Sequence, residues 1–271
     1  MKKFLSLFTA LIALALTAGS GEAAIKIGVT GTMYEELWAP AKERLAKEGI
    51  EIEIVQFSEY TLPNNALSNG EIDLNAFQHS IYLETEKKEY GYKLENIGYT
   101  FVIPLNLYSV KKSSVSELKD EDIVAIPNDL PNQGRGLKVL ESAGLIQLRK
   151  GAGFSPAIDD IEKYNVAIKL VELKGNTIPS ALQDVDAAII NGNYSIDFGI
   201  DPKDAIYHDD VLPREYWCMV TARSEDLTDP DKVALYKKIV KSFQTEATKD
   251  VFNNKFGGYF VAAGWDEDFL R

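Results

Sequence analysis

The chain has 271 residues, of which 45% are hydrophobic, 26% charged and 10% aromatic, and this composition excludes a disordered or low-complexity protein. Its 41 acidic residues outnumber its 29 basic residues, giving a net charge of −12, which argues against binding to nucleic acid or to an anionic membrane. One cysteine and two histidines exclude a disulfide framework and a thiolate metal cluster, and leave little for a histidine-rich metal site.

The first segment has the pattern of a secretory signal. Two lysines near the start are followed by an apolar run over residues 4–18 and then by small residues. This run is shorter than the roughly 20 residues that a membrane-spanning helix needs. We therefore expect residues 1–23 to be a signal peptide, cleaved after Ala23 or, alternatively, after Ser20.

The rest of the chain alternates predicted strands and helices. Strands are predicted where apolar residues alternate or run together, and helices where apolar residues recur every three to four positions. The predicted strands are residues 25–29, 50–55, 72–77, 94–99, 101–108, 122–127, 166–173, 186–191 and 216–221. The predicted helices are residues 34–48, 63–68, 81–90, 134–144, 178–182 (capped by Thr177) and 230–248. This order predicts an α/β protein with mostly parallel sheets.

The length predicts about two domains, at roughly 150 residues each. No proline- or glycine-rich linker separates the two halves of the sequence. We therefore expect the chain to cross between the domains within the sheets, which makes a hinge with a cleft. Ligands of such sheets bind at the carboxyl ends of strands, where helix N-termini also point.

Four places directly after predicted strands carry side chains suited to a binding site. These are Tyr60; Phe77, His79 and Tyr82; Asn128, Asn132 and Arg135; and Asn191, Asn193 and Tyr194.

Arg135 is the residue of this set with the clearest chemistry. The sequence places it in the first turn of the predicted helix, where the helix dipole disfavours a cation. An anionic ligand would remove this conflict, because a guanidinium binds a carboxylate through two parallel hydrogen bonds. The alternative is a surface arginine that pairs with one of the many acidic residues.

The aromatic residues favour an apolar pocket. Tyr60, Phe77 and Tyr82 together with His79 suit an aliphatic or thioether side chain of a ligand. Ordinary core packing is the alternative for the aromatic rings, and a structural hydrogen bond is the alternative for the histidine. Asn191 either binds a polar group of the ligand or merely ends its strand.

Catalysis finds little support in the sequence. GxSxG, HExxH and P-loop motifs are absent. A Cys218 nucleophile with His79 or His208 as its base stays open, although nothing in the spacing favours it.

At the four places above, the sequence resembles the methionine-binding proteins of the NLPA lipoprotein family, which are substrate-binding components of ABC importers. The matching segments are EYTLPNNALSNGEIDLNAFQH, GYTFVIPLNLYS, AIPNDLPNQGRGLKVLESAGLI and DAAIINGNY. They occur in family order and span most of the chain after the signal, which is far more specific than one short motif.

The resemblance implies a two-lobed α/β fold of the periplasmic-binding-protein type (type II), with a hinge and a central cleft. We expect residues 24–105 with 219–271 to form lobe I and residues 106–218 to form lobe II. The implied activity is binding of a free amino acid, methionine first, and its delivery to a permease driven by an ATPase. We expect a monomer with no cofactor, no catalytic activity and no nucleic-acid partner.

The resemblance also implies roles for individual residues. Arg135 would bind the ligand carboxylate, Asn191 would contact the polar backbone groups of the ligand, and Asn132 lies in the same motif as Arg135. The side chain of the ligand would be enclosed by Tyr60, Phe77, His79 and Tyr82. Tyr216 and Cys218 match the segment that follows the second lobe in the family.

Three departures from the family pattern bear on function. Ser20 stands where the family has its lipid-modified cysteine, so we expect a soluble exported protein. Ile81 replaces a usual proline. Cys218 stands where the family has an asparagine that helps to hold the amino acid, and a thiol is a weak hydrogen-bond partner.

The Cys218 departure leaves the identity of the ligand open. Either another group replaces the contact, or the pocket binds another amino acid, a methionine derivative or a small peptide. Trp217 beside it adds bulk near the predicted hinge. A sensor or surface protein that uses the same fold is the alternative to a transport protein.

Overall fold

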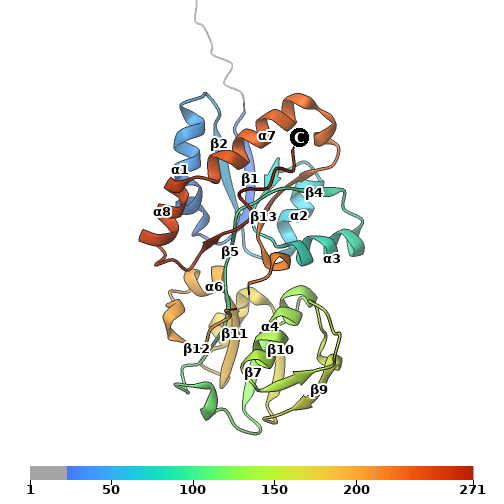
Figure 1. Cartoon of the computed structure of the whole chain (residues 1–271), viewed down its shortest axis with the longest axis vertical. Helices are drawn as coiled ribbons and strands as arrows, with labels where there is room; N and C mark the ends of the chain where they lie inside the picture. Colours follow the sequence, from blue (N-terminus) through green and yellow to red (C-terminus); the bar gives the residue numbers. More distant parts are fainter. Residues whose placement is uncertain (1–22, 211, 271) are drawn as a thin grey trace, which may run out of the picture.

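The computed structural model describes residues 23–210 and 212–270. The predicted signal peptide lies outside the described residues apart from Ala23, as does the position of Ser20. The described chain forms two lobes, one above the other along the long axis of the molecule (Figure 1). We call the lobe that contains the first strand lobe I and the other one lobe II.

Lobe I is built on a five-stranded sheet with the order β2-β1-β3-β13-β4. Its strands are β1 (Ile25–Thr30), β2 (Ile52–Phe57), β3 (Leu74–Asn75), β4 (Leu94–Tyr99) and β13 (Met219–Arg223). Its helices are α1 (Tyr34–Ala46), α2 (Thr61–Ser68), α3 (Ser80–Tyr90), α7 (Pro230–Phe243) and α8 (Glu246–Asn254). β1 runs parallel to β2 and β3, whereas β13 is antiparallel to its neighbours. The late strand β13 therefore completes a sheet that the first hundred residues begin.

Lobe II is built on a second five-stranded sheet, with the order β10-β7-β11-β6-β12. Its strands are β6 (Leu105–Tyr108), β7 (Ile123–Pro127), β10 (Lys169–Leu173), β11 (Ala187–Asn191) and β12 (Ala205–Tyr207). Its helices are α4 (Leu130–Ser142), α5 (Ile178–Ala181) and α6 (Gly192–Asp197), and a hairpin of β8 (Ile146–Leu148) and β9 (Ile161–Tyr164) flanks α4. Short 3-10 helices span Val115–Glu117, Ile158–Asp160, Gly175–Thr177, Pro202–Asp204, Arg214–Tyr216 and, in lobe I, Asp226–Thr228.

The sequence pattern explains the main elements. In β2 the side chains of Ile52 and Ile54 are buried and that of Glu53 is exposed, as the alternation requires of a strand with one buried face. Every residue of β11 is buried, consistent with a strand in the middle of a sheet. α3 ends at Gly91, which has a φ of 75° and thus adopts the left-handed conformation that glycine tolerates best.

Two segments connect the lobes. β5 (Phe101–Val102) pairs with β14 (Val261–Ala262) and continues through Ile103 and Pro104 into β6 of lobe II. The chain returns through residues 208–218, between β12 and β13. Two adjacent crossings of this kind form a hinge about which the lobes can close.

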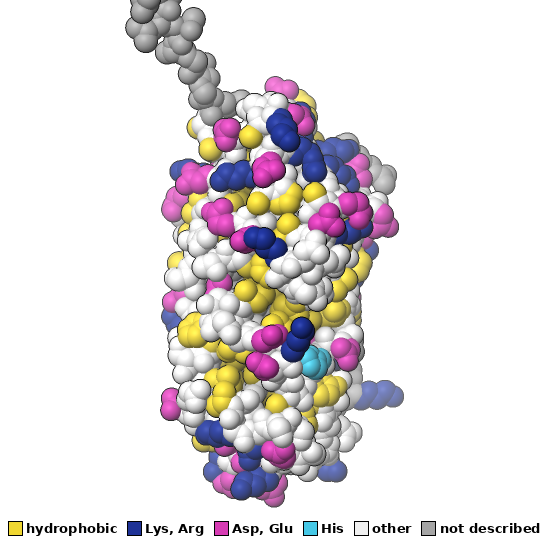
Figure 2. All heavy atoms as spheres, turned by 90° about the vertical axis from the view of Figure 1, so that its left-hand side faces the viewer, with side chains coloured by type: hydrophobic (Ala, Val, Ile, Leu, Met, Phe, Trp, Pro, Cys, Tyr) yellow, Lys and Arg dark blue, Asp and Glu magenta, His cyan; other side chains and the backbone are white. Residues whose placement is uncertain are grey.

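The lobes are closed on each other in this structure. Tyr60 Oη of lobe I donates a hydrogen bond of 2.5 Å to Asn193 Oδ1 of lobe II, and Asn193 Nδ2 donates one of 2.9 Å to the carbonyl of Thr30. Thr32 donates from its backbone nitrogen and its hydroxyl to Asp197 Oδ1, at 2.9 and 2.7 Å. On the face shown in Figure 2, acidic and basic side chains are interspersed and apolar side chains are exposed in the band where the lobes meet.

The structure corrects three predicted strands or helices. The strand predicted over residues 101–108 is interrupted at Ile103 and Pro104, because proline has no N–H to donate within a sheet. The strand predicted over residues 216–221 begins only at Met219, after the 3-10 helix that ends at Tyr216. The helix predicted over residues 230–248 is two helices, separated at Gln244 and Thr245.

Two further corrections concern helix starts. α4 begins at Leu130 rather than near Gly134, because Asp129 caps it and accepts a hydrogen bond from the backbone nitrogen of Asn132. Thr177 precedes α5, as predicted, but its hydroxyl donates to the carbonyl of Lys174 and does not cap the helix.

Candidate functional site

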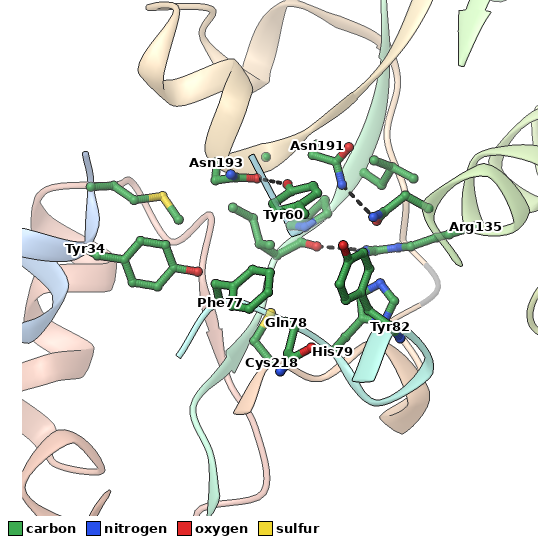
Figure 3. Close-up of a pocket in the computed structure, with 16 residues that line it drawn as sticks. Tyr34, Tyr60, Phe77, Gln78, His79, Tyr82, Arg135, Asn191, Asn193 and Cys218 are labelled. Carbon is green, nitrogen blue, oxygen red and sulfur yellow. Dashed lines mark hydrogen bonds between the residues drawn. The ribbon is translucent and has the colours of Figure 1, made fainter. Parts of the chain in front are cut away.

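A pocket lies between the two lobes and collects most of the residues that the sequence singled out. Its cavity volume is about 30 Å³. The walls therefore stand close together, as expected for closed lobes. The pocket is lined by Met33, Tyr34, Tyr60, Phe77, Gln78, His79, Tyr82, Ile103, Pro104, Leu105, Asn132, Arg135, Asn191, Gly192, Asn193 and Cys218 (Figure 3).

Three aromatic rings of lobe I form one wall of this pocket. The ring centroids of Tyr60, Phe77 and Tyr82 lie 5.8–5.9 Å from one another. Phe77 follows β3, Tyr60 precedes α2 and Tyr82 lies in the first turn of α3, so strand and helix ends bring the rings together. Such a cluster presents a rigid apolar surface to a ligand side chain.

His79 contributes a polar atom to the same lobe. It caps α3, and its Nδ1 accepts a hydrogen bond of 3.3 Å from the backbone nitrogen of Tyr82. Burial, and then the charge of Arg135, lower the pKa of His79 to about 3. The neutral ring with an accepting Nδ1 carries its proton on Nε2, and Nε2 has no partner among the described residues. His79 can therefore donate one hydrogen bond to a ligand.

Arg135 stands in lobe II and is buried. It lies in the second turn of α4, not in the first as predicted, because the helix begins at Leu130. Its Nη2 and Nε donate to Asp209 Oδ2 at 2.8 and 3.2 Å, and Nη2 also donates to the carbonyl of Ile103 at 2.8 Å. The described residues provide no hydrogen-bond acceptor for Nη1, which leaves that nitrogen for a ligand carboxylate.

A chain of hydrogen bonds orients Asn191. Asp129 accepts from Asn132 Nδ2 at 2.7 Å, and Asn132 Oδ1 accepts from Asn191 Nδ2 at 2.9 Å. Because the carboxylate at one end can only accept, the orientation of each amide along the chain follows from it. Asn191 Oδ1 is left buried without a partner among the described residues. A buried acceptor in this position can be satisfied by the amino group of a ligand.

Tyr216 and Trp217 lie outside the pocket lining. The Tyr216 ring covers the guanidinium of Arg135, with 4.6 Å from the ring centroid to Cζ, and its hydroxyl donates to the carbonyl of Phe154 at 3.1 Å. Trp217 packs edge-on against Tyr99, with ring centroids 5.4 Å apart. Tyr216 can thus act on a ligand through Arg135 and through the His79 ring, whose centroid lies 5.6 Å from its own, and its predicted contact with the ligand stays a prediction.

Cys218 does line the pocket, next to His79, with which it forms an isolated antiparallel bridge. Burial raises the pKa of its thiol to about 12. A thiol in this environment is a poor nucleophile, because the thiolate is the reactive form.

The sequence prediction missed several residues that line the pocket, most of them unremarkable by type. Asn193, which the sequence placed in the fourth group of candidate residues without a role, bridges the lobes through its bonds to Tyr60 and Thr30. Gly192 lies so close to Ile103 that a Cβ atom would stand 2.4 Å from its side chain. Tyr34 lacks a signal in the sequence, because only the tertiary structure brings the start of α1 to the pocket, whereas Gln78 lies between Phe77 and His79 in a segment that carries the resemblance.

Two features are absent from the described residues, a cluster of metal-ligating side chains and a helix suited to span a membrane. Within residues 23–210 and 212–270, no three side chains of the types His, Cys, Asp and Glu are grouped to hold a metal ion. In the same part of the chain, no helix combines the length and the apolar character needed to cross a bilayer.

A model of the NlpA lipoprotein family matches residues 25–264. The chain belongs to the NlpA lipoprotein family. A D-methionine-binding lipoprotein of Yersinia pestis, MetQ, is 41% identical over 246 residues, which cover 89% of this chain and 88% of that protein.

Solved structures of the family agree in fold. A nutrient binding protein from Burkholderia cenocepacia bound to methionine has a TM-score of 0.82 and 34% identity, covering 89% of this chain and all of that one (100%). The substrate binding protein of a methionine transporter from Streptococcus pneumoniae has a TM-score of 0.83 and 30% identity, covering 89% and 95%. The family and the two-lobed fold predicted from the sequence motifs are thereby confirmed.

Proposed function

We propose that this protein is the substrate-binding component of an ABC importer and that it binds a free amino acid, methionine first, between its lobes. One observation carries the proposal. The pocket between the lobes is lined by Arg135, His79 and Asn191, each of which has a polar atom without a partner among the described residues, and by a wall of three aromatic rings.

These groups match the parts of an amino acid. The carboxylate would accept from Arg135 and His79, and the ammonium group would donate to Asn191. A thioether side chain packs favourably against aromatic rings, so methionine suits the wall of Tyr60, Phe77 and Tyr82. Side chains of the size of leucine would also fit against these rings, but they lack the sulfur atom that packs favourably against them.

The surroundings of Arg135 favour a free amino acid over a peptide. Its guanidinium is backed by Asp209 and the Ile103 carbonyl and covered by the Tyr216 ring. A peptide whose first residue occupied this position would offer Arg135 an uncharged amide carbonyl in place of a carboxylate. Desolvated partners left unpaired in this way cost about 1–3 kcal/mol each.

Cys218 is the residue through which the ligand can differ from methionine. A thiol in place of an amide leaves a polar group of the ligand weakly paired, which costs roughly 1–3 kcal/mol, or about 5- to 150-fold in affinity. Cys218→Asn should therefore raise the affinity for methionine if that contact is missing. Unchanged affinities for every ligand would remove the basis for a shifted specificity.

The first experiment is native mass spectrometry of the protein without residues 1–23, followed by calorimetric titration. The titrated ligands are L-methionine, D-methionine, leucine and a methionine dipeptide. Binding of either methionine with a dissociation constant at or below the micromolar range would support the proposal. Saturable binding of the dipeptide alone, or of no amino acid, would refute it.

The cellular setting follows from the same proposal. We expect an exported protein without catalytic activity that acts as a monomer and delivers its ligand to a permease with its ATPase. Residues 24–105 with 219–271 would move as one body and residues 106–218 as the other. Ligand would favour the closed state, because only closure brings both walls into contact with it.

A further inference from the structure

The pocket contains one ionised side chain among the described residues that line it. That residue is Arg135, and every other titratable group in the lining is neutral near pH 7. The pKa of His79 is lowered to about 3, and that of Cys218 is raised to about 12, chiefly by burial. Burial likewise raises the pKa values of Tyr34, Tyr60 and Tyr82.

Asp209 places a negative charge directly behind the one positive charge. Its Oδ2 lies 2.8 Å from Nη2 and 3.2 Å from Nε of Arg135, and both side chains are at most 8% exposed. Asp209 is itself held in place, because its backbone nitrogen donates to Asn106 Oδ1 at 2.9 Å. Asp209 lies in the hinge segment through which the chain returns to lobe I. Asn106 lies just after the other hinge segment, which leads from lobe I into lobe II.

Two other carboxylates near the pocket have separate partners. Asp129 caps α4 and accepts from the backbone and the side chain of Asn132 at 3.0 and 2.7 Å, so the helix N-terminus offsets its charge. Burial raises the pKa of Glu86, which accepts from Asn64 and Tyr82 on the far side of the aromatic wall. Arg135 and Asp209 are therefore the charged side chains that determine the electrostatic potential where the ligand would bind.

We propose that Asp209 is a specificity-determining residue, which balances Arg135 so that the cleft selects a zwitterion over an anion of the same shape. This inference rests on the proposed function, since it assumes an amino-acid ligand. With Arg135 alone, a buried positive site would favour any carboxylate. With Asp209 behind it, a lone carboxylate meets a balanced pair, whereas an added ammonium group is attracted by the Asp209 charge. Asp209 does not touch the ligand and acts through charge and through the position of Arg135.

The test is a comparison of ligands that differ in charge and hardly in shape. Methionine is the zwitterion, 4-(methylthio)butanoate lacks the ammonium group, and methioninol lacks the carboxylate. Calorimetric titration of the wild-type protein should show methionine bound much more tightly than either analogue. In Asp209→Asn, the preference for methionine over the anion should fall by about 10- to 50-fold, because one charge that attracts the ammonium group is removed.

Two variants separate charge from structure. Asp226→Asn is the matched control, because Asp226 is also buried and lies 2.8 Å from Arg223 Nη2, but Arg223, unlike Arg135, does not line the pocket. It should leave the preference unchanged. Asp209→Glu keeps the charge and should retain most of the preference even where it weakens binding of all ligands.

Two outcomes would overturn the inference. Asp209→Asn could leave the ratio of the affinities for methionine and the anion unchanged, and an equal weakening of both would show a structural effect alone. A wild-type protein that bound 4-(methylthio)butanoate as tightly as methionine would overturn it without any variant. If the wild type binds leucine and not methionine, the ligand assignment fails, and the same comparison is made with leucine and 4-methylpentanoate.

Discussion

The two walls of the cleft are chemically different, and each belongs to one lobe. Lobe I supplies the aromatic wall of Tyr60, Phe77 and Tyr82. Lobe II supplies most of the polar wall, with Arg135 and the amide chain that ends at Asn191. His79 is the exception, since it brings a polar nitrogen from lobe I close to Arg135.

This division separates two tasks of recognition. The polar wall recognises what all amino acids share, and the aromatic wall recognises the side chain that distinguishes them. Neither wall alone encloses a ligand, so binding and closure are coupled. Changes in lobe II should therefore alter whether an amino acid binds, and changes in lobe I should alter which one binds.

The largest effect is expected from removing the polar wall. Arg135→Ala should weaken methionine binding by about 100-fold or more, because truncating one partner of a buried, hydrogen-bonded charge pair costs about 2–5 kcal/mol. All amino acids should be affected alike in titration calorimetry. Arg214→Ala is the control, since this guanidinium is half exposed and lies outside the pocket lining. If Arg135→Ala bound methionine as tightly as the wild-type protein does, the assignment of the polar wall would be wrong.

A smaller and selective effect is expected from the aromatic wall. Phe77→Ala removes one ring of the cluster, and burial of such a side chain is worth about 1.5–3 kcal/mol. Methionine should bind about 10- to 100-fold more weakly, whereas the affinity for alanine should change little. Competition measurements with the two amino acids give the ratio directly. A uniform loss for both would show that the walls do not divide recognition as proposed.

The lowered pKa of His79 predicts that the stability of the protein depends on pH. Its pKa is 6.5 in the unfolded chain and about 3 in the folded protein, so between these values the unfolded chain binds more protons. Its contribution to the free energy of unfolding is complete above pH 6.5 and falls by about 1.4 kcal/mol per pH unit toward pH 3.

The matched variant is His79→Asn, which retains an acceptor for the backbone nitrogen of Tyr82 and does not titrate. Urea unfolding at pH 7, 5.5 and 4.5 should show a shallower loss of stability in this variant. Parallel curves for the two proteins would exclude a buried neutral His79.

The smallest effect is expected from the contacts that close the lobes. Asp197→Ala removes the acceptor for two hydrogen bonds from Thr32, which are worth about 0.5–1.5 kcal/mol each. Small-angle X-ray scattering without ligand should show a larger radius of gyration, and methionine affinity should fall about 3- to 10-fold. Asp204→Ala, at an exposed position of lobe II, should change neither quantity.

Local sequence patterns were sufficient for most secondary structure, and together with the family resemblance they singled out residues that the fold brings close together, whose contact with a ligand stays a prediction. Eight of the nine residues proposed for the site line one pocket, and only Tyr216 lies behind Arg135. The errors occur where a single residue changes the secondary structure that the surrounding hydrophobic pattern predicts. Pro104 interrupts a predicted strand, and Asp129 starts α4 one turn early. Both errors lie beside the hinge or the pocket.

The sequence by itself determined the alternation of strands and helices, the positions after strands that bear polar and aromatic side chains, and the family. These follow from periodicity, from turn residues and from motifs, all of which are local in the chain. Only the tertiary structure decided which charge accompanies Arg135, because Asp209 lies 74 positions away and no local pattern connects the two. It also decided that Asn193 and Asp197 hold the lobes together, since contacts across a hinge depend on how two separate sheets are placed relative to each other.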